Sequence, residues 1–244
     1  MDASFLSSEG KVALITGGSR GIGRSTALAF ADAGADVVIA ARKLPDLEAV
    51  AAEIKQMGRK ALVVETHAKK SEDLKNLVDE TMAEFGRIDI LVNNAATNPA
   101  MSSVLDTDEE VFSHIIDTNL KGYFMLSKLV GKIMVEQKSG NIINISSSGG
   151  VSPVEGVGPY CISKAGINML TKQMALELGP YNIRVNAIAP RIVTTKFSEA
   201  FWKNEKLMER EYKMVPLKVV ASPEEIAQAA LYLASSATNY MTGH

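Results

Sequence analysis

The sequence contains a single cysteine, Cys161, among its 244 residues, so no disulfide bond can form within the chain. A small fold stabilised by several disulfide bonds is excluded, and the protein is expected in a reducing compartment. Cys161 fits a small helix side chain better than a reactive thiol. The first residues carry no basic segment followed by an apolar one, and no uninterrupted apolar run approaches the roughly 20 residues of a membrane span. A cytoplasmic protein with no membrane partner is therefore expected.

An excess of charge of one sign is also lacking. Lys and Arg number 26 and Asp and Glu 28, for a formal net charge of -2, and the two signs alternate along the chain. Because this pattern leaves no extended basic face, no nucleic-acid partner is predicted. Hydrophobic residues make up 46% of the sequence, enough for one large core. A single α/β domain covering residues 1–244 is therefore predicted.

The first motif is a strand, a glycine-rich turn and a helix. Residues 11–16 are a short β-rich run, and residues 24–33 form an alanine-rich amphipathic stretch. Between them, Gly17, Gly21 and Gly23 would let the backbone approach a phosphate, and the helix would offer unpaired N–H groups and its positive dipole end. The spacing Gly-x-x-x-Gly-x-Gly differs from the usual dinucleotide fingerprint, so the glycines alone are weak evidence.

The end of the next strand, expected at residues 35–41, predicts which dinucleotide binds. An acidic residue there favours the free 2′-hydroxyl of NAD, whereas arginine accommodates the 2′-phosphate of NADP. Here Ala41 is followed by Arg42, and Arg20 in the glycine turn offers a second cation. We therefore predict NADP (NADPH), with NAD less favoured. The alternative for each arginine is a solvated surface charge.

Strands and helices alternate along the rest of the chain. Further strands are predicted over 61–65, 88–92, 142–145 and 183–189, and helices over 45–58, 71–85, 107–135 and 222–233 and after Pro159. This alternation favours a parallel, doubly wound sheet with helices on both faces. Residues 191–217 break the rhythm with aromatic residues and methionines among many charges. We interpret them as a helical lid over a substrate pocket, with a plain surface hairpin as the alternative.

The segment 141–171 is expected to carry the chemistry. Its apolar strand ends in serines that include Ser147, and Tyr160 and Lys164 follow one helical turn apart. A free phenol has a pKa of roughly 10, and a nearby ammonium would lower the pKa of Tyr160 toward neutral pH, where it can exchange a proton. The Ser147 hydroxyl would bind the same substrate oxygen. Taken alone, a solvated Tyr and Lys is the default explanation of this spacing.

Asn119 stands in the middle of the helix predicted over 107–135, where asparagine has a poor propensity. A buried amide bonded to backbone and a role in the site explain it equally well.

Together these motifs resemble the short-chain dehydrogenase/reductases, in the compact single-domain branch of that family. The resemblance spans nearly the whole chain and rests on TGGSRGIG at 16–23, Asn-Asn-Ala at 93–95, and the order of Asn119, Ser147, Tyr160 and Lys164. It implies a Rossmann-type fold, a catalytic tetrad formed by those four residues, and hydride transfer between nicotinamide C4 and a carbonyl carbon with Tyr160 as the proton donor. Lys164 would also bind the nicotinamide ribose, and Asn119 would hold a backbone group or water that links Lys164 to solvent.

The resemblance also implies the remaining contacts. The cofactor-binding residues are Gly17, Ser19, Arg20, Gly21, Ile22, Gly23, Arg42, Asn93, Ala95, Tyr160, Lys164, Pro190, Ile192, Val193 and Thr195, and no metal is required. The segments NAATNP and FSEAFW resemble broad-specificity carbonyl reductases, so the expected substrate is a moderately apolar ketone, aldehyde or secondary alcohol. A 3-oxoacyl thioester on acyl carrier protein is the enzymatic alternative, and an NADP-sensing protein is the non-enzymatic one. A homotetramer or homodimer is implied.

Four features depart from the family pattern. Arg191 stands where Pro-Gly is usual, so the loop beside the nicotinamide is expected to be reshaped. His67 replaces an acid that contacts the adenine amino group, and Ala96 replaces a frequent glycine. The sequence stops at Thr-Gly-His, where relatives continue into a final strand and an Asp-Gly-Gly tail, so the last edge strand is expected to be absent from this chain.

Overall fold

The computed structural model describes residues 3–99 and 101–244. Their strands form one six-stranded parallel sheet in the order β3-β2-β1-β4-β5-β6. The strands are β1 Val12–Thr16, β2 Asp36–Ala41, β3 Ala61–Glu65, β4 Ile90–Asn93, β5 Gly140–Ile145 and β6 Ile183–Ile188. The order reverses between β1 and β4, and a doubly wound sheet binds its ligands outside the carboxyl ends of the strands at such a point. The predicted α/β fold is confirmed.

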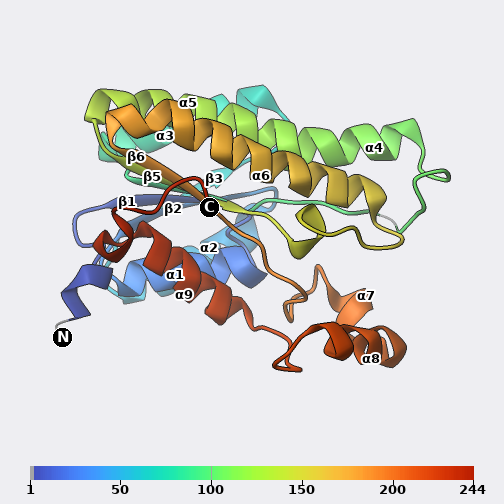
Figure 1. Cartoon of the computed structure of the whole chain (residues 1–244). Helices are drawn as coiled ribbons and strands as arrows, with labels where there is room; N and C mark the ends of the chain where they lie inside the picture. Colours follow the sequence, from blue (N-terminus) through green and yellow to red (C-terminus); the bar gives the residue numbers. More distant parts are fainter. Residues whose placement is uncertain (1–2, 100) are drawn as a thin grey trace.

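Helices cover both faces of the sheet, as Figure 1 shows. The helices are α1 Gly21–Asp32, α2 Leu44–Gln56, α3 Ser71–Phe85, α4 Glu109–Ile116, α5 Gly122–Gln137, α6 Gly158–Leu178, α7 Glu199–Trp202, α8 Glu205–Met214 and α9 Pro223–Ala234. One face is covered by α1, α2 and α9, and the other by α3, α5 and α6. Within the described ranges no helix is long and apolar enough to cross a bilayer.

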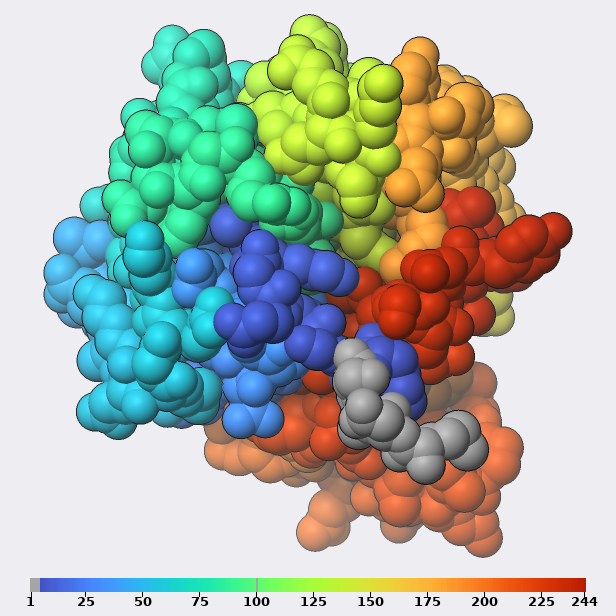
Figure 2. All heavy atoms as spheres, turned by 90° about the vertical axis from the view of Figure 1, so that its left-hand side faces the viewer, coloured from blue at the N-terminus to red at the C-terminus, as the bar shows by residue number. Residues whose placement is uncertain are grey.

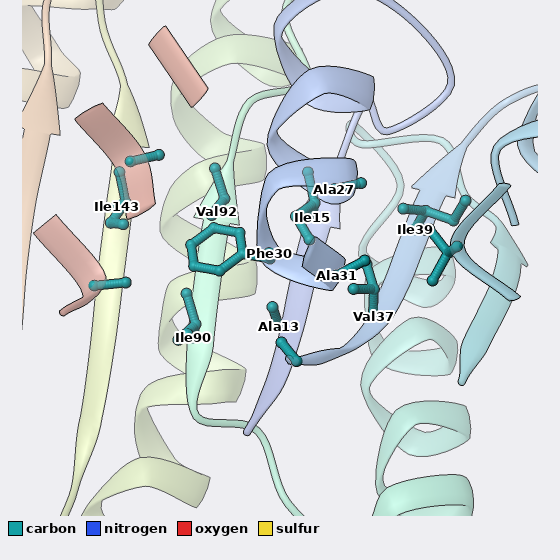
Figure 3. Packing of buried hydrophobic residues seen from close by; sticks show 14 of the residues in the cluster. Ala13, Ile15, Ala27, Phe30, Ala31, Val37, Ile39, Ile90, Val92 and Ile143 are labelled. Atoms are coloured by element: carbon teal, nitrogen blue, oxygen red, sulfur yellow. The ribbon is translucent and has the colours of Figure 1, made fainter. Parts of the chain in front are cut away.

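The strands read as apolar runs because both of their faces are buried. Successive side chains of β1 point to opposite faces, so Ala13 and Ile15 belong to the core under α1, whereas Val12 and Leu14 belong to the core under α3 and α5. In the first of these cores Phe30 of α1 lies over the sheet near Val92 (Figure 3). The rigid sheet that results fixes the positions at which its strands end.

Both ends of the described chain pack against the rest of the fold. The 3-10 turn Ala3–Leu6 lies beside the segment that follows α9, where the Ser236 hydroxyl donates a hydrogen bond to the Phe5 carbonyl at 3.4 Å (Figure 2). Residues 242–244 lie along β6, with Gly243 N–H donating to the Val185 carbonyl at 2.8 Å and Ala187 N–H donating to the His244 carbonyl at 2.6 Å. The edge of β6 is therefore partly paired by the last residues, although no strand follows β6 in the described part of the chain.

Candidate active site

A cavity of about 530 Å³ opens at the carboxyl ends of the strands. Its walls are the loops that follow each of the six strands, together with residues from the start of α6 and from α7 and α8. Most of the predicted cofactor contacts line it, namely Gly17, Ser19, Arg20, Gly21, Ile22, Arg42, Ala95, Tyr160, Lys164, Pro190, Ile192, Val193 and Thr195. The fold thus brings together residues that lie as much as 178 positions apart in the sequence.

The turn after β1 has the shape of a phosphate cradle. Gly17 and Gly21 have φ values of +66° and +53°, which L side chains rarely adopt. A Cβ atom on Gly23 would lie 2.2 Å from the Gly17 carbonyl oxygen, so this glycine lets α1 approach the turn. Arg20 precedes α1 in extended conformation, and no side chain in the described ranges caps the first N–H groups of that helix. These donors fit the pyrophosphate of a dinucleotide.

Hydrogen bonds tie this turn to the end of β4. The Thr16 hydroxyl oxygen accepts from the backbone N–H groups of Asn94 and Ala95 at 3.0 and 3.1 Å, and the Asn94 amide donates to the Thr16 carbonyl at 2.9 Å. Two neighbouring strand ends are therefore held as one rigid wall of the cavity.

The structure places two predicted cofactor residues, Asn93 and Gly23, outside the lining of the cavity as far as the described residues show. The Asn93 amide is buried and donates to the Ser127 hydroxyl at 2.8 Å and to the Asn144 side-chain oxygen at 2.9 Å. Asn93 therefore cross-links β4, α5 and β5 behind the cavity, while Asn94 lines it in its place. Gly23 acts through packing.

Positive charge gathers where β2 and β3 end. Arg42 and Lys43 follow β2 and line the cavity there, as does Arg20 from the turn after β1, with Asp46 from the first turn of α2 as a nearby acid. The corner thus offers three cations against one carboxylate, a balance that suits an anionic ligand.

His67 lies in the same corner, and burial lowers its pKa, as do the charges of Lys69, Arg42 and Lys70. Its backbone N–H donates to the Asp73 carboxylate at 2.9 Å. Its Nδ1 atom is buried and has no hydrogen-bond partner among the described residues. A neutral imidazole therefore stands where the sequence comparison with the family expects an acid.

Asn119 lies in a π-helical turn, Asp117–Lys121, that interrupts the helix predicted over residues 107–135 and separates α4 from α5. The fully buried amide accepts from Thr97 N–H at 2.8 Å and donates to the Thr97 carbonyl at 3.0 Å and to the Ser163 hydroxyl at 3.1 Å. Single π-helical turns are concentrated at functional sites. Here the turn aims Asn119 at a segment that lines the cavity, because Thr97 is one of its walls.

Ser147, Tyr160 and Lys164 meet in the cavity. The Ser147 hydroxyl accepts from Gly149 N–H at 3.1 Å, and its influence lowers the pKa of the Tyr160 phenol. Lys164 is buried, its Nζ atom donates to the Ile145 carbonyl at 2.7 Å, and Nζ lies 5.5 Å from the centre of the Tyr160 ring. The predicted phenol, hydroxyl and ammonium are thus neighbours in space.

Comparison with known proteins agrees with this geometry. Residues 17–244 match the family model described as Enoyl-(Acyl carrier protein) reductase. Dehydrogenase/reductase SDR family member 4 of Oryctolagus cuniculus is 36% identical over 233 residues, which are 96% of this chain and 90% of that protein. The chain belongs to the short-chain dehydrogenase/reductase family.

Two further relatives indicate the range of this family. The 3-oxoacyl-[acyl-carrier-protein] reductase FabG of Thermotoga maritima is 38% identical over 236 residues, 96% of this chain and 94% of that protein. The solved structure of 7α-hydroxysteroid dehydrogenase complexed with NADH and 7-oxo glycochenodeoxycholic acid matches with a TM-score of 0.95 and 32% identity, over 100% of this chain and 94% of that one. An oxidoreductase that binds a nicotinamide cofactor is therefore established at the family level.

The expected lowering of the Tyr160 pKa is wrong for the protein alone. Burial raises the pKa of Tyr160 to about 12, although the influence of the Ser147 hydroxyl acts in the opposite direction. Burial also lowers the pKa of Lys164 to about 7. The charge of the lysine alone would lower the Tyr160 pKa, whereas loss of water disfavours the charged forms of both side chains.

Tyr123 lies beside Lys164 but is not among the described residues that line the cavity, and sequence reasoning missed it. It is 2% exposed, its hydroxyl donates to the Ile145 carbonyl at 3.3 Å, and the centre of its ring lies 5.3 Å from Lys164 Nζ. The Lys164 side chain of this short-chain dehydrogenase/reductase therefore lies near two aromatic rings. Its spacing from Asn119 crosses the π-helical turn, so no α-helical spacing in the sequence points to it.

Part of the cavity wall is apolar. Val154, Val157, Cys161, Phe197 and Phe201 line it. The ring of Phe197 lies 6.1 Å from that of Tyr160, measured between centroids. Phe197, an aromatic residue of the segment 191–217, thus lies beside the acid/base candidate.

Proposed function

We propose that this protein is an NADP(H)-dependent oxidoreductase that interconverts a ketone or aldehyde and the corresponding alcohol. The observation that carries the proposal is the meeting of Tyr160, Ser147 and Lys164 in a cavity that also contains the glycine turn. When bound, the nicotinamide supplies or accepts the hydride at its C4 atom. Side chains of the protein bind and orient the substrate and transfer the proton.

The Ser147 and Tyr160 hydroxyls hold the substrate oxygen, and Tyr160 gives it a proton during reduction or takes one during oxidation. Lys164 uses one of its three N–H groups on the Ile145 carbonyl, and the others remain to bind a ribose hydroxyl beside the phenol. A charged Lys164 in this place opposes the desolvation that raises the Tyr160 pKa. Asn119 fixes the Thr97 backbone at the cavity wall.

The preference for NADP rests on the cationic corner. Arg20 and Arg42 line the cavity at the end where the adenosine ribose binds in this type of sheet, and Ala41 occupies the strand end where an NAD-binding protein has an acid. One relative is described as a complex with NADH, so membership of the family does not decide the question. The two guanidinium groups favour a 2′-phosphate by charge-assisted hydrogen bonds.

An apolar carbonyl compound is the proposed substrate, because Val154, Phe197 and Phe201 line the cavity near Tyr160. A segment that carries aromatic residues over the site suits a lid better than a surface hairpin. A 3-oxoacyl thioester is the second candidate, since FabG of Thermotoga maritima is 38% identical to this chain. An assembly of two or four subunits is part of the proposal. It is supported by the exposed apolar side chains Phe124 on α5 and Met169 and Leu176 on α6.

The test is the consumption of NADPH and of NADH, followed at the absorbance of the reduced nicotinamide. The panel contains aliphatic and aromatic ketones, aldehydes, a 3-oxoacyl thioester and an enoyl thioester. Turnover with NADPH and simple carbonyls is expected. Turnover restricted to the 3-oxoacyl thioester would favour the second candidate, and tight NADPH binding without any turnover would favour a sensor.

A further inference from the structure

The segment between β6 and α9 is joined to the sheet by few polar contacts. Figure 1 shows α7 and α8 lying together beyond the carboxyl ends of the strands, apart from the helices that cover the sheet. The side chain of Trp202 in α7 donates to the Thr195 carbonyl at 2.9 Å. The inner face of α8 consists of its buried and half-buried residues, which are Leu207, Met208 and Glu211. Glu211 is the only charged member of this inner face.

Glu211 forms a two-pronged ion pair with Arg191. Arg191 Nη2 lies 3.0 Å from Glu211 Oε2, and Arg191 Nε contacts Glu211 Oε1. The side chains are 35% and 14% exposed. A bidentate guanidinium–carboxylate pair of this burial is stronger and less screened by salt than an exposed pair.

Arg191 is an anchor on the rigid part of the molecule. It follows Pro190, whose carbonyl accepts from Ser148 N–H at 2.9 Å, next to the candidate catalytic Ser147. Both Arg191 and Glu211 line the cavity. In the described residues, the contacts made by Arg191 are the only hydrogen bonds and ion pairs that join α8 to the loop after β6.

We propose that the Arg191–Glu211 ion pair holds α8 over the cavity and thereby sets the rate at which the cofactor and product leave. Arg191 and Glu211 are positioning residues, since the pair acts through the placement of α8. The part that concerns cofactor and product rests on the proposed function. The part that concerns the placement of α8 does not.

The first test measures the attachment of α8 without any ligand. Chymotrypsin cuts after Phe201, Trp202 and Tyr212, and none of these residues changes in the variants used. Glu211→Gln keeps the shape of the side chain and removes its charge, so cleavage within residues 201–214 should become about three- to tenfold faster. The doubly exchanged variant, Arg191→Glu with Glu211→Arg, should restore the slow rate, because it re-forms the pair in reverse order.

Glu199→Gln is the matched control. Glu199 lies in α7, pairs with Lys203 one turn later and does not line the cavity in the described structure, so its loss removes a carboxylate from the same segment without touching the link to the sheet. Its cleavage rate should equal that of the wild type. Thermal unfolding of each variant separates local opening from global destabilisation, and Arg191→Gln replaces Glu211→Gln if the latter does not fold. Cleavage that stays at the wild-type rate, or that the exchanged pair fails to slow, overturns the proposal.

The second test measures dissociation of NADPH by stopped flow, using the fluorescence of the reduced nicotinamide. Glu211→Gln should release NADPH about three- to tenfold faster and raise KM for the carbonyl without lowering kcat, and the exchanged pair should reverse both changes. If the wild type reduces no carbonyl while its lid cleavage still depends on the pair, the proposed function fails and the placement of α8 by the pair stands. If the wild type turns over normally and all variants match it in cleavage rate and NADPH release, the proposed role of the Arg191–Glu211 pair is refuted.

Discussion

Replacement of Lys164 by methionine should change how the stability of the protein depends on pH. The ammonium is 1% exposed and its pKa is lowered by burial from 10.5 to about 7. Between these two values the unfolded chain keeps a proton on this lysine that the folded protein has released. Because the unfolded state binds more protons, the free energy of unfolding rises with pH in this window. Below about pH 7 both states are protonated, so the penalty is at its largest there.

The size of the effect follows from the interval between the two pKa values. Each pH unit of the window contributes up to about 1.4 kcal/mol, so wild type should gain roughly 2 to 3 kcal/mol relative to Lys164→Met between pH 7 and pH 9.5. Tyr160 contributes nothing to this difference, because burial raises its pKa to about 12 and it stays neutral throughout. Methionine has a similar length and no charge, so Lys164→Met should be the more stable protein at pH 7.

The assay is urea unfolding without cofactor at half-unit pH steps, at one protein concentration so that subunit assembly does not alter the comparison. Lys172→Met, an exposed lysine of the same helix, provides the control and should follow the wild-type curve. A difference between wild type and Lys164→Met that stays flat from pH 7 to pH 9.5 would refute the reasoning. It would mean that the folded protein keeps Lys164 charged.

Two further substitutions test the cofactor corner and the π-helical turn. Arg42→Asp should weaken NADPH binding about 10- to 100-fold and leave NADH binding equal or tighter, because an acid replaces a phosphate-binding cation. Fluorescence titration with both cofactors measures this, with Lys55→Asp as the control. An unchanged ratio of the NADPH and NADH affinities would mark Arg42 as a surface charge. Asn119→Ala should lower the free energy of unfolding by about 2 to 4 kcal/mol, because the Thr97 backbone and Ser163 lose buried partners. Urea unfolding beside the exposed control Asn239→Ala measures that loss, and a change below 1 kcal/mol would count against the role given to Asn119.

The sheet and the helices that cover it could be predicted because each element leaves a local pattern of apolar residues in the sequence. Buried parallel strands give short apolar runs, and the predicted helix over residues 71–85 coincides with α3, Ser71–Phe85. The π-helical turn at Asp117–Lys121 could not be predicted, because its only indication in the sequence is an asparagine, Asn119, in the middle of a helical pattern. An extra residue in a helical turn changes the direction of side chains without changing the apolar period enough to be noticed.

The residues of the candidate site could be predicted from the sequence, but their burial and its effect on their pKa values could not. Tyr160, Ser147 and Lys164 meet as expected, whereas the direction of the Tyr160 pKa depends on burial, which local spacing does not specify. Asn93 and Asn94 are adjacent in sequence, yet they point to opposite sides of the strand end, and Asn94 lines the cavity. The pairing of Arg191 with Glu211 joins residues 20 positions apart through the fold of a segment that has no regular period.

The most direct test of the proposed chemistry follows a deuterium label. NADPH carrying deuterium at both hydrogen positions of C4 would be incubated with an apolar ketone and either wild type or Tyr160→Phe, with NADPH affinity measured for both. The account predicts that wild type places deuterium on the carbinol carbon of the alcohol, whereas Tyr160→Phe binds NADPH normally and forms almost no product. Alcohol without the label, or product formed by Tyr160→Phe at a rate near that of wild type, would contradict it.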